Sequence, residues 1–301
     1  MPGMTSIEGK VRFGVGLGAD TTPEDLPGIV DYLESSGADS VWFSELVYSP
    51  AVDPFIGMAY TLSRTTRLKA GTSVAILPGR HPVLVAKQVA SLAALAPRRV
   101  LPAFGLHSAL TAERDVFTVP RGRRGAVFDE SLELLNAVLR GRDVSFDGEF
   151  FKVRSADVQP VPAKPVDIWL GGSGPVALAR IGRLADGWLG SFLTPVEAGA
   201  ARRTIEREAQ AAGREIEPDH YGISLAVAAG DIPDDVYDMA RRRRPEVDPA
   251  ELIAADWPTL HRRIDAYVDA GLTKFVVRPV GSGDREAFLE RFVGELLPRQ
   301  N

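Results

Sequence analysis

Strand-like and helix-like runs alternate along almost the whole chain, and this alternation limits the folds open to it. The strand-like runs are rich in β-branched and aromatic residues, as buried strands are. They lie at Val11–Gly18, Ser40–Glu45, Leu68–Leu77, Arg99–Leu106, Val166–Gly171, Gly187–Phe192, Tyr221–Ala229 and Lys274–Val280. Strands that alternate with helices predict a parallel sheet of the α/β class, and eight such units predict a (β/α)8 TIM barrel. The 301 residues fit a single domain of this kind over 1–301.

Helical periodicity and end signals place a helix after each strand. Thr22 is the expected N-cap of the first helix and Asp53 that of the second. The expected helices cover Pro23–Ser36, Asp53–Arg64, Pro82–Leu95, Arg123–Arg140, Pro175–Ala185, Pro195–Ala212, Pro258–Ala270 and Arg285–Leu297. Two short insertions break the pattern: a hairpin near 144–165, signalled by Asp147-Gly148, and a polar helical insertion near 231–257.

Charge and composition exclude several functions. The formal net charge is −5, so no basic field attracts nucleic acid or an anionic membrane. The chain has no cysteine, which excludes disulfides, thiolate metal sites and a cysteine nucleophile. No apolar run approaches the ~20 residues of a membrane span, and residues 1–10 lack the apolar core of a signal peptide. We therefore expect a cytoplasmic protein that does not bind nucleic acid or a membrane.

A glycine-rich turn, Gly171-Gly172-Ser173-Gly174-Pro175, joins an expected strand directly to a helix. Free N–H groups and the positive end of the helix would favour a phosphate there. The turn is equally explained as a tight connection that needs glycine for positive φ. The glycines of Gly14–Gly18, by contrast, lie within a strand and open no helix, so they are a weak dinucleotide motif.

Other reactive side chains stand at expected strand ends, where barrel active sites lie. Glu45 is either a functional carboxylate or the partner of an arginine. His107 is either an acid or base or a hydrogen-bonded histidine of the rim. His220 and His261 show no ligand spacing, so no metal site is expected. The run Arg241–Arg244 is expected to form a solvated helix face.

Several sequence blocks, in order, resemble one family. They are Ser40–Glu45, Gly71–Pro82, the hairpin segment Phe146–Phe151, Ile168–Gly174 and Ala185–Trp188. Jointly, over about Val11 to Val280, they are similar to the bacterial luciferase-like monooxygenase superfamily. The likeness is strongest to its branch that uses the deazaflavin coenzyme F420.

The resemblance implies a barrel that holds a flavin or deazaflavin at its C-terminal mouth. It implies a non-proline cis peptide bond at Ser73–Val74, behind the ring of the coenzyme. It also implies that the glycine-rich turn lies near the phosphate. The residues expected to contact the cofactor are Thr72, Ser73, Val74, Leu106, His107, Gly171, Gly172, Ser173, Gly174 and Pro175.

Two positions depart from the sugar-phosphate dehydrogenases of this family. Leu46 stands where they carry a catalytic histidine, and Ser108 where they carry an acid. Glu45 and His107 remain as the expected catalytic residues. An apolar substrate pocket is expected at Tyr48, Phe104 and Phe192. Arg278 either holds an anionic group of the substrate or cofactor or forms an ion pair at the barrel rim.

The sequence thus predicts an F420-dependent oxidoreductase that moves a hydride to or from a small organic substrate. One alternative is a monooxygenase that uses reduced FMN and O₂, and a flavin or F420 reductase would then be a partner. A second is a non-catalytic flavin or deazaflavin carrier. A homodimer is expected, since dimers are common in the family.

Overall fold

The computed structural model describes residues 10–108, 110–228, 232–281 and 284–301. Contacts within the chain define two compact units. Unit 1 comprises Met1–Gly16, Ser173–Arg183 and Gly187–Asn301, and unit 2 comprises Leu17–Gly172 and Leu184–Asp186. The expected single domain over 1–301 stays a prediction, and each unit is described by itself.

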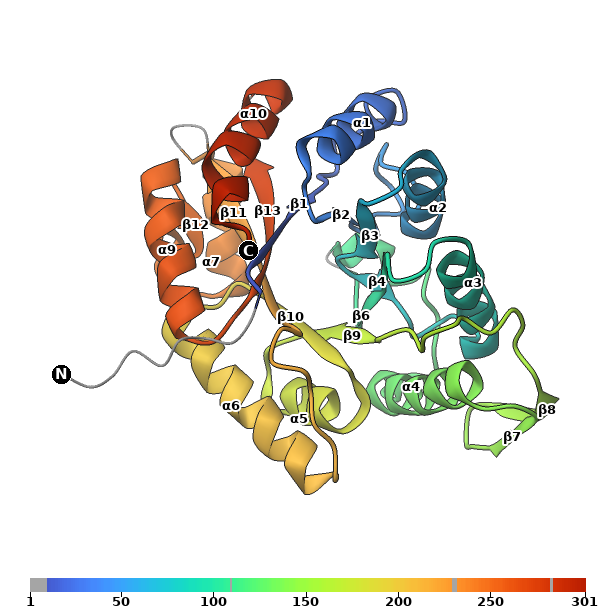
Figure 1. Cartoon of the computed structure of the whole chain (residues 1–301). Coiled ribbons are helices and arrows are strands. Elements are labelled where there is room, and N and C mark those ends of the chain that lie inside the picture. The colour runs from blue at the N-terminus through green and yellow to red at the C-terminus, as the bar shows by residue number, and fades with distance from the viewer. Residues whose placement is uncertain (1–9, 109, 229–231, 282–283) are drawn as a thin grey trace. The chain divides into compact units, whose positions relative to one another are not determined.

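Unit 2 contains two runs of parallel strands (Figure 1). In the first, β2 (Ser40–Phe43), β3 (Lys69–Thr72) and β5 (Val100–Leu101) pair in that order. In the second, β4 (Ala75–Ile76), β6 (Ala103–Gly105) and β9 (Trp169–Gly171) pair in that order. Each of the expected strands Leu68–Leu77 and Arg99–Leu106 is therefore two short strands, one interrupted at Ser73–Val74 and the other at Pro102.

The helices of unit 2 begin where their capping residues stand. The side chain of Asp53 accepts from the N–H groups of Phe55 and Ile56, so α2 runs over Pro54–Arg64. His81 caps α3 (Pro82–Leu95), and α4 covers Arg124–Arg140. The expected start of the first helix is wrong. The backbone N–H and hydroxyl of Thr22 both donate to Asp25, and α1 begins only at Leu26 (Leu26–Ser36).

Unit 1 is built on parallel strands paired in the order β10 (Gly187–Ser191), β11 (Tyr221–Ala228), β13 (Lys274–Val280) and β1 (Arg12–Gly16). The strand β12 (Ile253–Ala254) pairs with β11. The last residue of the expected strand Tyr221–Ala229 lies outside the described residues. The helices of this unit are α5 (Pro175–Leu184), α6 (Pro195–Ala211), α9 (Trp257–Asp269) and α10 (Arg285–Leu296).

Both predicted insertions are confirmed. The strands β7 (Val144–Asp147) and β8 (Lys152–Ala156) form an antiparallel hairpin in which Asp147 pairs with Lys152. The helices α7 (Asp234–Arg243) and α8 (Pro249–Leu252) occupy the second insertion. Ala240 and Leu252 pack there in a small cluster with Ala228, at the end of β11.

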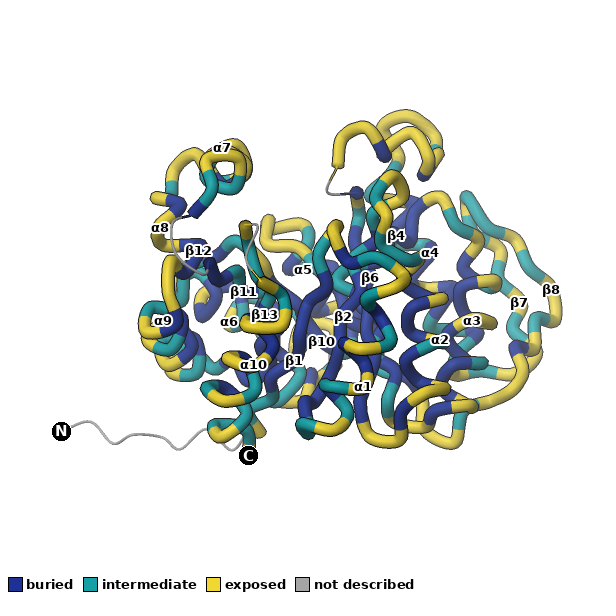
Figure 2. Tube along the Cα trace, turned by 90° about the horizontal axis from the view of Figure 1, so that it is seen from above, coloured by how far each residue is buried: buried dark blue, intermediate teal, exposed yellow. Residues whose placement is uncertain are grey.

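Burial follows the strands, most of which are dark blue in Figure 2. Their inward side chains include Trp42, Phe104 and Trp169 in unit 2, and Phe13 and Phe275 in unit 1. The rings of Phe13 and Phe275 are stacked, with their centroids 5.6 Å apart. Among the described residues, no helix is both long enough and apolar enough to span a membrane.

Candidate functional site

The break between β3 and β4 is a cis peptide bond at Ser73–Val74, as the family resemblance implies. The neighbouring strand β2 and the residues after it hold this segment. The N–H of Ser73 donates to the carbonyl of Phe43 at 2.7 Å, and the N–H of Glu45 donates to the carbonyl of Val74 at 3.4 Å. The segment therefore lies at the carboxyl ends of β2 and β3, the strand end at which barrel enzymes carry their active sites.

The two hydroxyl groups at this break differ in their partners. Thr72 is fully buried, and its Oγ1 donates to the carbonyl of Ala103 at 2.6 Å and accepts from the N–H of Ala103 at 2.8 Å. Its hydroxyl therefore joins β3 to β6. The buried Oγ of Ser73 has no hydrogen-bond partner among the described residues. Of the two, only Ser73 keeps a hydroxyl unengaged for a ligand.

Glu45 contacts this segment through its backbone and is 6% exposed. Its Oε2 accepts from the N–H of Ile76 at 2.5 Å and from Nη1 of Arg80 at 2.8 Å, and its Oε1 pairs with Nη2 of Arg80. The Arg80 guanidinium also lies over the ring of Phe117, 5.1 Å from its centroid. Of the two roles considered for Glu45, the geometry matches the partner of an arginine. Its carboxylate ties the end of β2 to β4 and α3.

His107 follows β6, and its side chain is open to solvent. Partial burial, with the positive charges of Arg124 and Arg114, lowers the pKa of His107 below its ordinary value. The imidazole is therefore neutral at neutral pH, and one ring nitrogen can accept a proton while the other donates a hydrogen bond.

The expected pocket residues of unit 2 have different positions. Tyr48 is 66% exposed, so its side chain is available to a ligand. Phe104 is 0% exposed and packs in the core. That burial argues against the predicted substrate contact at Phe104, because an inward residue of a short buried strand has no surface to offer.

Arg278 lies on β13 in unit 1, near its carboxyl end. Its Nη2 donates to Oγ of Ser224 at 2.7 Å, and no carboxylate in the described ranges pairs with it. Burial and the nearby charge of Arg243 lower the pKa of Arg278 to about 10, so it remains a cation at neutral pH. A partly buried cation without a counter-ion is suited to bind an anion.

Phe192 follows β10 and carries the Arg243 guanidinium over its ring, 4.8 Å from the centroid. The interpretation of Arg241–Arg244 as a solvated face is wrong for Arg244. That side chain is 17% exposed and pairs with Glu197 at 2.6 Å and with Glu246 at 2.5 Å. Arg244 thereby fastens the end of α7 to the start of α6, and its hydrogen bond lowers the pKa of Glu197.

The glycine-rich turn spans the boundary of the two units, with Gly171 and Gly172 in unit 2 and Ser173 to Pro175 in unit 1. Gly172 has φ of +125°, so the tight-turn explanation holds for that glycine. Gly174 differs, because a β-carbon there would meet nothing within 4 Å. The first turn of α5 carries no acidic residue. A phosphate at this helix end would therefore meet no repulsion from the first turn of α5.

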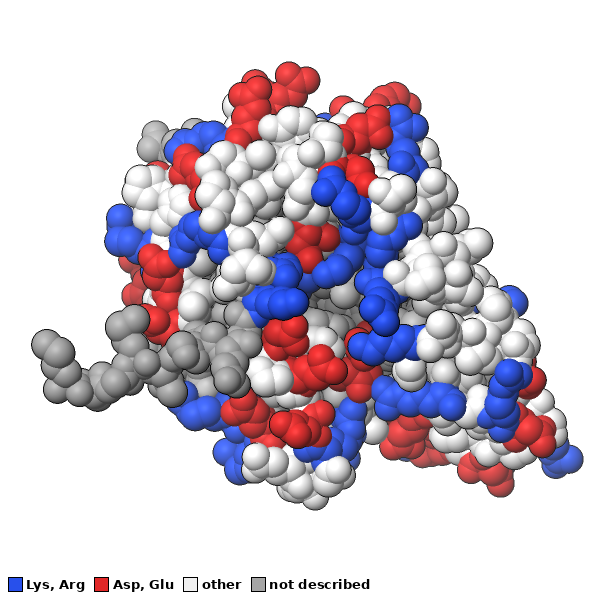
Figure 3. Space-filling model, in the orientation of Figure 1, with Lys and Arg blue, Asp and Glu red and all other residues white. Residues whose placement is uncertain are grey.

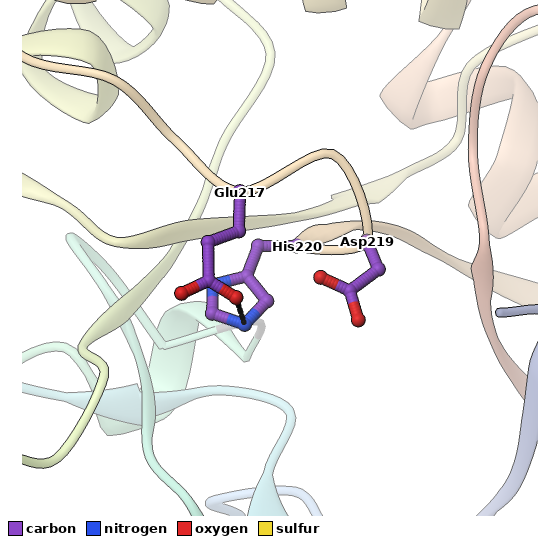
Figure 4. A group of neighbouring side chains, drawn as sticks. All are labelled: Glu217, Asp219 and His220. Atoms are coloured by element: carbon purple, nitrogen blue, oxygen red, sulfur yellow. Dashed lines mark ion pairs between the residues drawn. The ribbon is translucent and has the colours of Figure 1, made fainter. Parts of the chain in front are cut away.

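One group of potential metal ligands occurs among the described residues, where no metal site was expected. Glu217, Asp219 and His220 offer ligand atoms within 4.8 Å of one another (Figure 4). Nε2 of His220 lies 3.6 Å from Oε2 of Glu217. The three residues share a turn before β11, at the amino end of that strand, whereas Arg278 lies beside Ala226, nearer its carboxyl end.

Sequence reasoning missed Glu113, a fully buried carboxylate in the turn η1 (Thr111–Glu113). It accepts from the hydroxyl of Ser108 at 2.6 Å and from the N–H of Tyr48 at 2.9 Å. The replacement of the family acid by Ser108 was the available signal. A serine hydroxyl at that position can donate a hydrogen bond to a carboxylate, but the sequence does not show which acidic residue accepts it.

Comparison with known proteins now places the chain. The family model described as luciferase-like monooxygenase matches residues 9–282. The chain belongs to this family.

An F420-dependent glucose-6-phosphate dehydrogenase of Beutenbergia cavernae is 29% identical over 96% of this chain and 97% of its own length. Among solved structures, a coenzyme F420-dependent tetrahydromethanopterin reductase from Methanopyrus kandleri aligns with a TM-score of 0.78, at 20% identity, over 97% of this chain and all of its own. An F420-dependent secondary alcohol dehydrogenase aligns with a TM-score of 0.80, at 18% identity, over 96% and 98%. These likenesses confirm the predicted α/β barrel class.

Proposed function

We propose that this chain is an F420-dependent oxidoreductase that transfers a hydride between coenzyme F420 and a small organic molecule. The observation that carries the proposal is the likeness, over nearly the full length of both chains, to a dehydrogenase named for F420. The charge distribution supports a small-molecule substrate. Acidic and basic side chains are both present on the face in Figure 3, and the formal net charge of −5 gives no overall attraction to nucleic acid.

The residues present fit such a coenzyme, which is anionic through its phosphate. Gly174 leaves open space at the start of α5, and the first turn of that helix has no acid to repel a phosphate. Ser73 carries a buried hydroxyl without a partner in the described ranges. In unit 1, the start of α5 at Ser173 to Pro175 is suited to a phosphate. In unit 2, Ser73, Val74, Leu106 and His107 would line the ring of the coenzyme.

The coenzyme supplies the hydride-carrying carbon, while the protein supplies position and electrostatics. Glu45 and Arg80 fix the segment after β3. His107, neutral at neutral pH, takes or gives the proton that accompanies hydride transfer to or from a carbonyl. Arg278 attracts the anionic or polar group of the substrate.

Glucose 6-phosphate is not assigned as the substrate. Leu46 and Ser108 occupy the two positions that differ from the sugar-phosphate dehydrogenases. We propose instead a small carbonyl compound or alcohol bearing an anionic group, because Arg278 has no carboxylate partner in the described part of the chain.

Fluorescence titration of the purified protein with F420 and with FMN tests the proposal. Selective binding of F420 is expected, and Gly174→Asp should weaken it at least tenfold by repelling the phosphate. Gly174→Asn has nearly the same size without the charge, and should weaken binding much less. Gly294→Asp places the same substitution at an exposed glycine of α10 with open space around it and serves as the control.

The family description as a monooxygenase favours one second candidate, an enzyme that uses reduced FMN and O₂. Selective FMN binding, together with oxygen consumption in the presence of reduced FMN, would replace the F420 proposal with this one. Binding of neither coenzyme would reject both.

A further inference from the structure

Glu113 is a buried carboxylate for which the proposed reaction gives no role. It is 0% exposed, and no lysine or arginine in the described ranges forms an ion pair with it. Burying a charge is costly unless hydrogen bonds compensate for the lost water. The hydrogen-bond partners of Glu113 should therefore indicate why this carboxylate is buried.

Those partners come from two different loops of unit 2. Oε1 accepts from the backbone N–H of Tyr48, which follows β2, at 2.9 Å. Oε2 accepts from the hydroxyl of Ser108, which follows β6, at 2.6 Å. Oγ of Ser108 in turn accepts from the N–H of Leu110 at 3.1 Å. One carboxylate thus joins the loops after two strands and organises the second loop around Ser108.

The side chains that these loops present are open to solvent. His107 directly precedes the anchored Ser108, and Tyr48, held by its backbone, is 66% exposed. The buried contacts are therefore made by the backbone or by the adjacent residue, while neither the imidazole nor the phenol is hydrogen-bonded within the described part of the chain. A ligand group needs such support, because a side chain on an unsupported loop does not keep a reactive geometry.

We propose that Glu113 is a positioning residue, which fixes His107 and Tyr48 at the carboxyl ends of β6 and β2 for the reaction. This inference rests on the proposed function for its kinetic part. Glu113 touches neither substrate nor coenzyme and acts through the two loops.

Two variants remove the same contact from opposite sides. Glu113→Gln keeps an oxygen for Tyr48 but loses the acceptor for the Ser108 hydroxyl. Ser108→Ala leaves Glu113 in place and serves if the first variant fails to fold. Each should lower kcat at least tenfold and change KM for F420 less than threefold. Asp31→Asn, at an exposed ion pair with Arg64, is the matched carboxylate-to-amide control and should leave both constants unchanged.

A double-mutant cycle separates positioning from general destabilisation. In a His107→Asn background, Glu113→Gln should lower kcat less than twofold further, because the proton-transferring side chain through which Glu113 affects kcat is gone. If the loss persists in full in that background, or if neither single variant lowers kcat, the proposal is overturned.

A readout without coenzyme keeps the two proposals distinguishable. In the Glu113→Gln protein, the amide hydrogen of Leu110, which donates to the Ser108 hydroxyl, should exchange at least tenfold faster. The NMR signals of the His107 ring should broaden or shift. If wild-type protein shows no turnover with F420, the proposed function fails, and these signals still decide the positioning claim. Unchanged exchange and unchanged His107 signals would overturn it.

Discussion

Gly105 and Val74 lie so close that no β-carbon fits between them. A β-carbon on Gly105 would lie 2.5 Å from Cγ2 of Val74, a distance that real β-carbons do not show. Val74 lies in the interruption between β3 and β4, while Gly105 ends β6. The glycine therefore sets how closely Val74 can approach β6.

Gly105→Ala should push Val74 away from β6. We expect a loss of about 1–3 kcal/mol in the free energy of unfolding, the usual cost of overpacking a core, and weaker binding of F420. Urea denaturation and fluorescence titration measure the two effects. Gly28→Ala is the control, because a β-carbon at this helical glycine meets nothing within 4 Å; it should stabilise the protein by about 0.5–1 kcal/mol. Unchanged stability of Gly105→Ala would contradict the packing argument.

Arg80→Met should be among the most destabilising single changes in unit 2. It leaves the carboxylate of Glu45, whose side chain is 3% exposed, without its positive partner. Breaking a buried ion pair from one side costs about 3–5 kcal/mol, and chemical denaturation would measure it. Arg64→Met breaks the exposed pair with Asp31 and should cost at most about 1 kcal/mol. Equal losses of stability in the two variants would show that burial does not strengthen the contribution of the Glu45–Arg80 ion pair.

The depressed pKa of His107 predicts a pH dependence of stability. Protonation is less favourable in the folded protein than in the unfolded chain, where the pKa is about 6.5. The contribution is therefore fully present above about pH 6.5 and is lost as the pH falls through the folded-state pKa. Thermal melting at pH 7.5 and 5.5 should show a smaller pH effect in His107→Asn than in the wild type. An NMR titration midpoint at or above the ordinary value would refute this.

Arg278→Met should affect stability and function in opposite directions. The substitution removes a buried cation that pairs with no carboxylate in the described ranges, so the melting temperature should rise or stay constant. The same change should raise KM for an anionic substrate at least tenfold. Arg291→Met, at a surface pair with Glu295, is the matched control and should leave KM unchanged. A fall in melting temperature with unchanged KM would show that Arg278 is structural.

Residue patterns predicted the fold well where local chemistry decides it. Asp53 caps its helix as expected, and Gly37 ends α1 with φ of +81°. The first helix begins late because the N–H and hydroxyl of Thr22 both donate to Asp25, so the Thr22 hydroxyl is engaged outside α1. Hydrophobic alternation also could not show that Pro102 divides one expected strand.

The site was harder to predict, because its contacts join residues far apart in the sequence. Glu45 could be foreseen as either catalytic or paired, but only the fold brings Arg80 to it. Arg244 looked solvated within a run of arginines, and its burial depends on Glu197 in another helix. Glu113 carries no motif, and only its contacts with Tyr48 and Ser108 distinguish it from a surface acid.

Thr72 and Ser73 are adjacent residues whose hydroxyl groups differ in their hydrogen bonding. At Thr72 a side chain replaces a missing rung of the sheet, since its oxygen serves both the N–H and the carbonyl of Ala103. Valine would match the shape of Thr72 but would leave the buried N–H and carbonyl of Ala103 without this hydrogen-bond partner. Serine would keep both hydrogen bonds. The sheet therefore requires a hydroxyl side chain at position 72. At position 73, by contrast, a change of side chain can alter ligand preference without breaking the hydrogen bonds between β3 and β6.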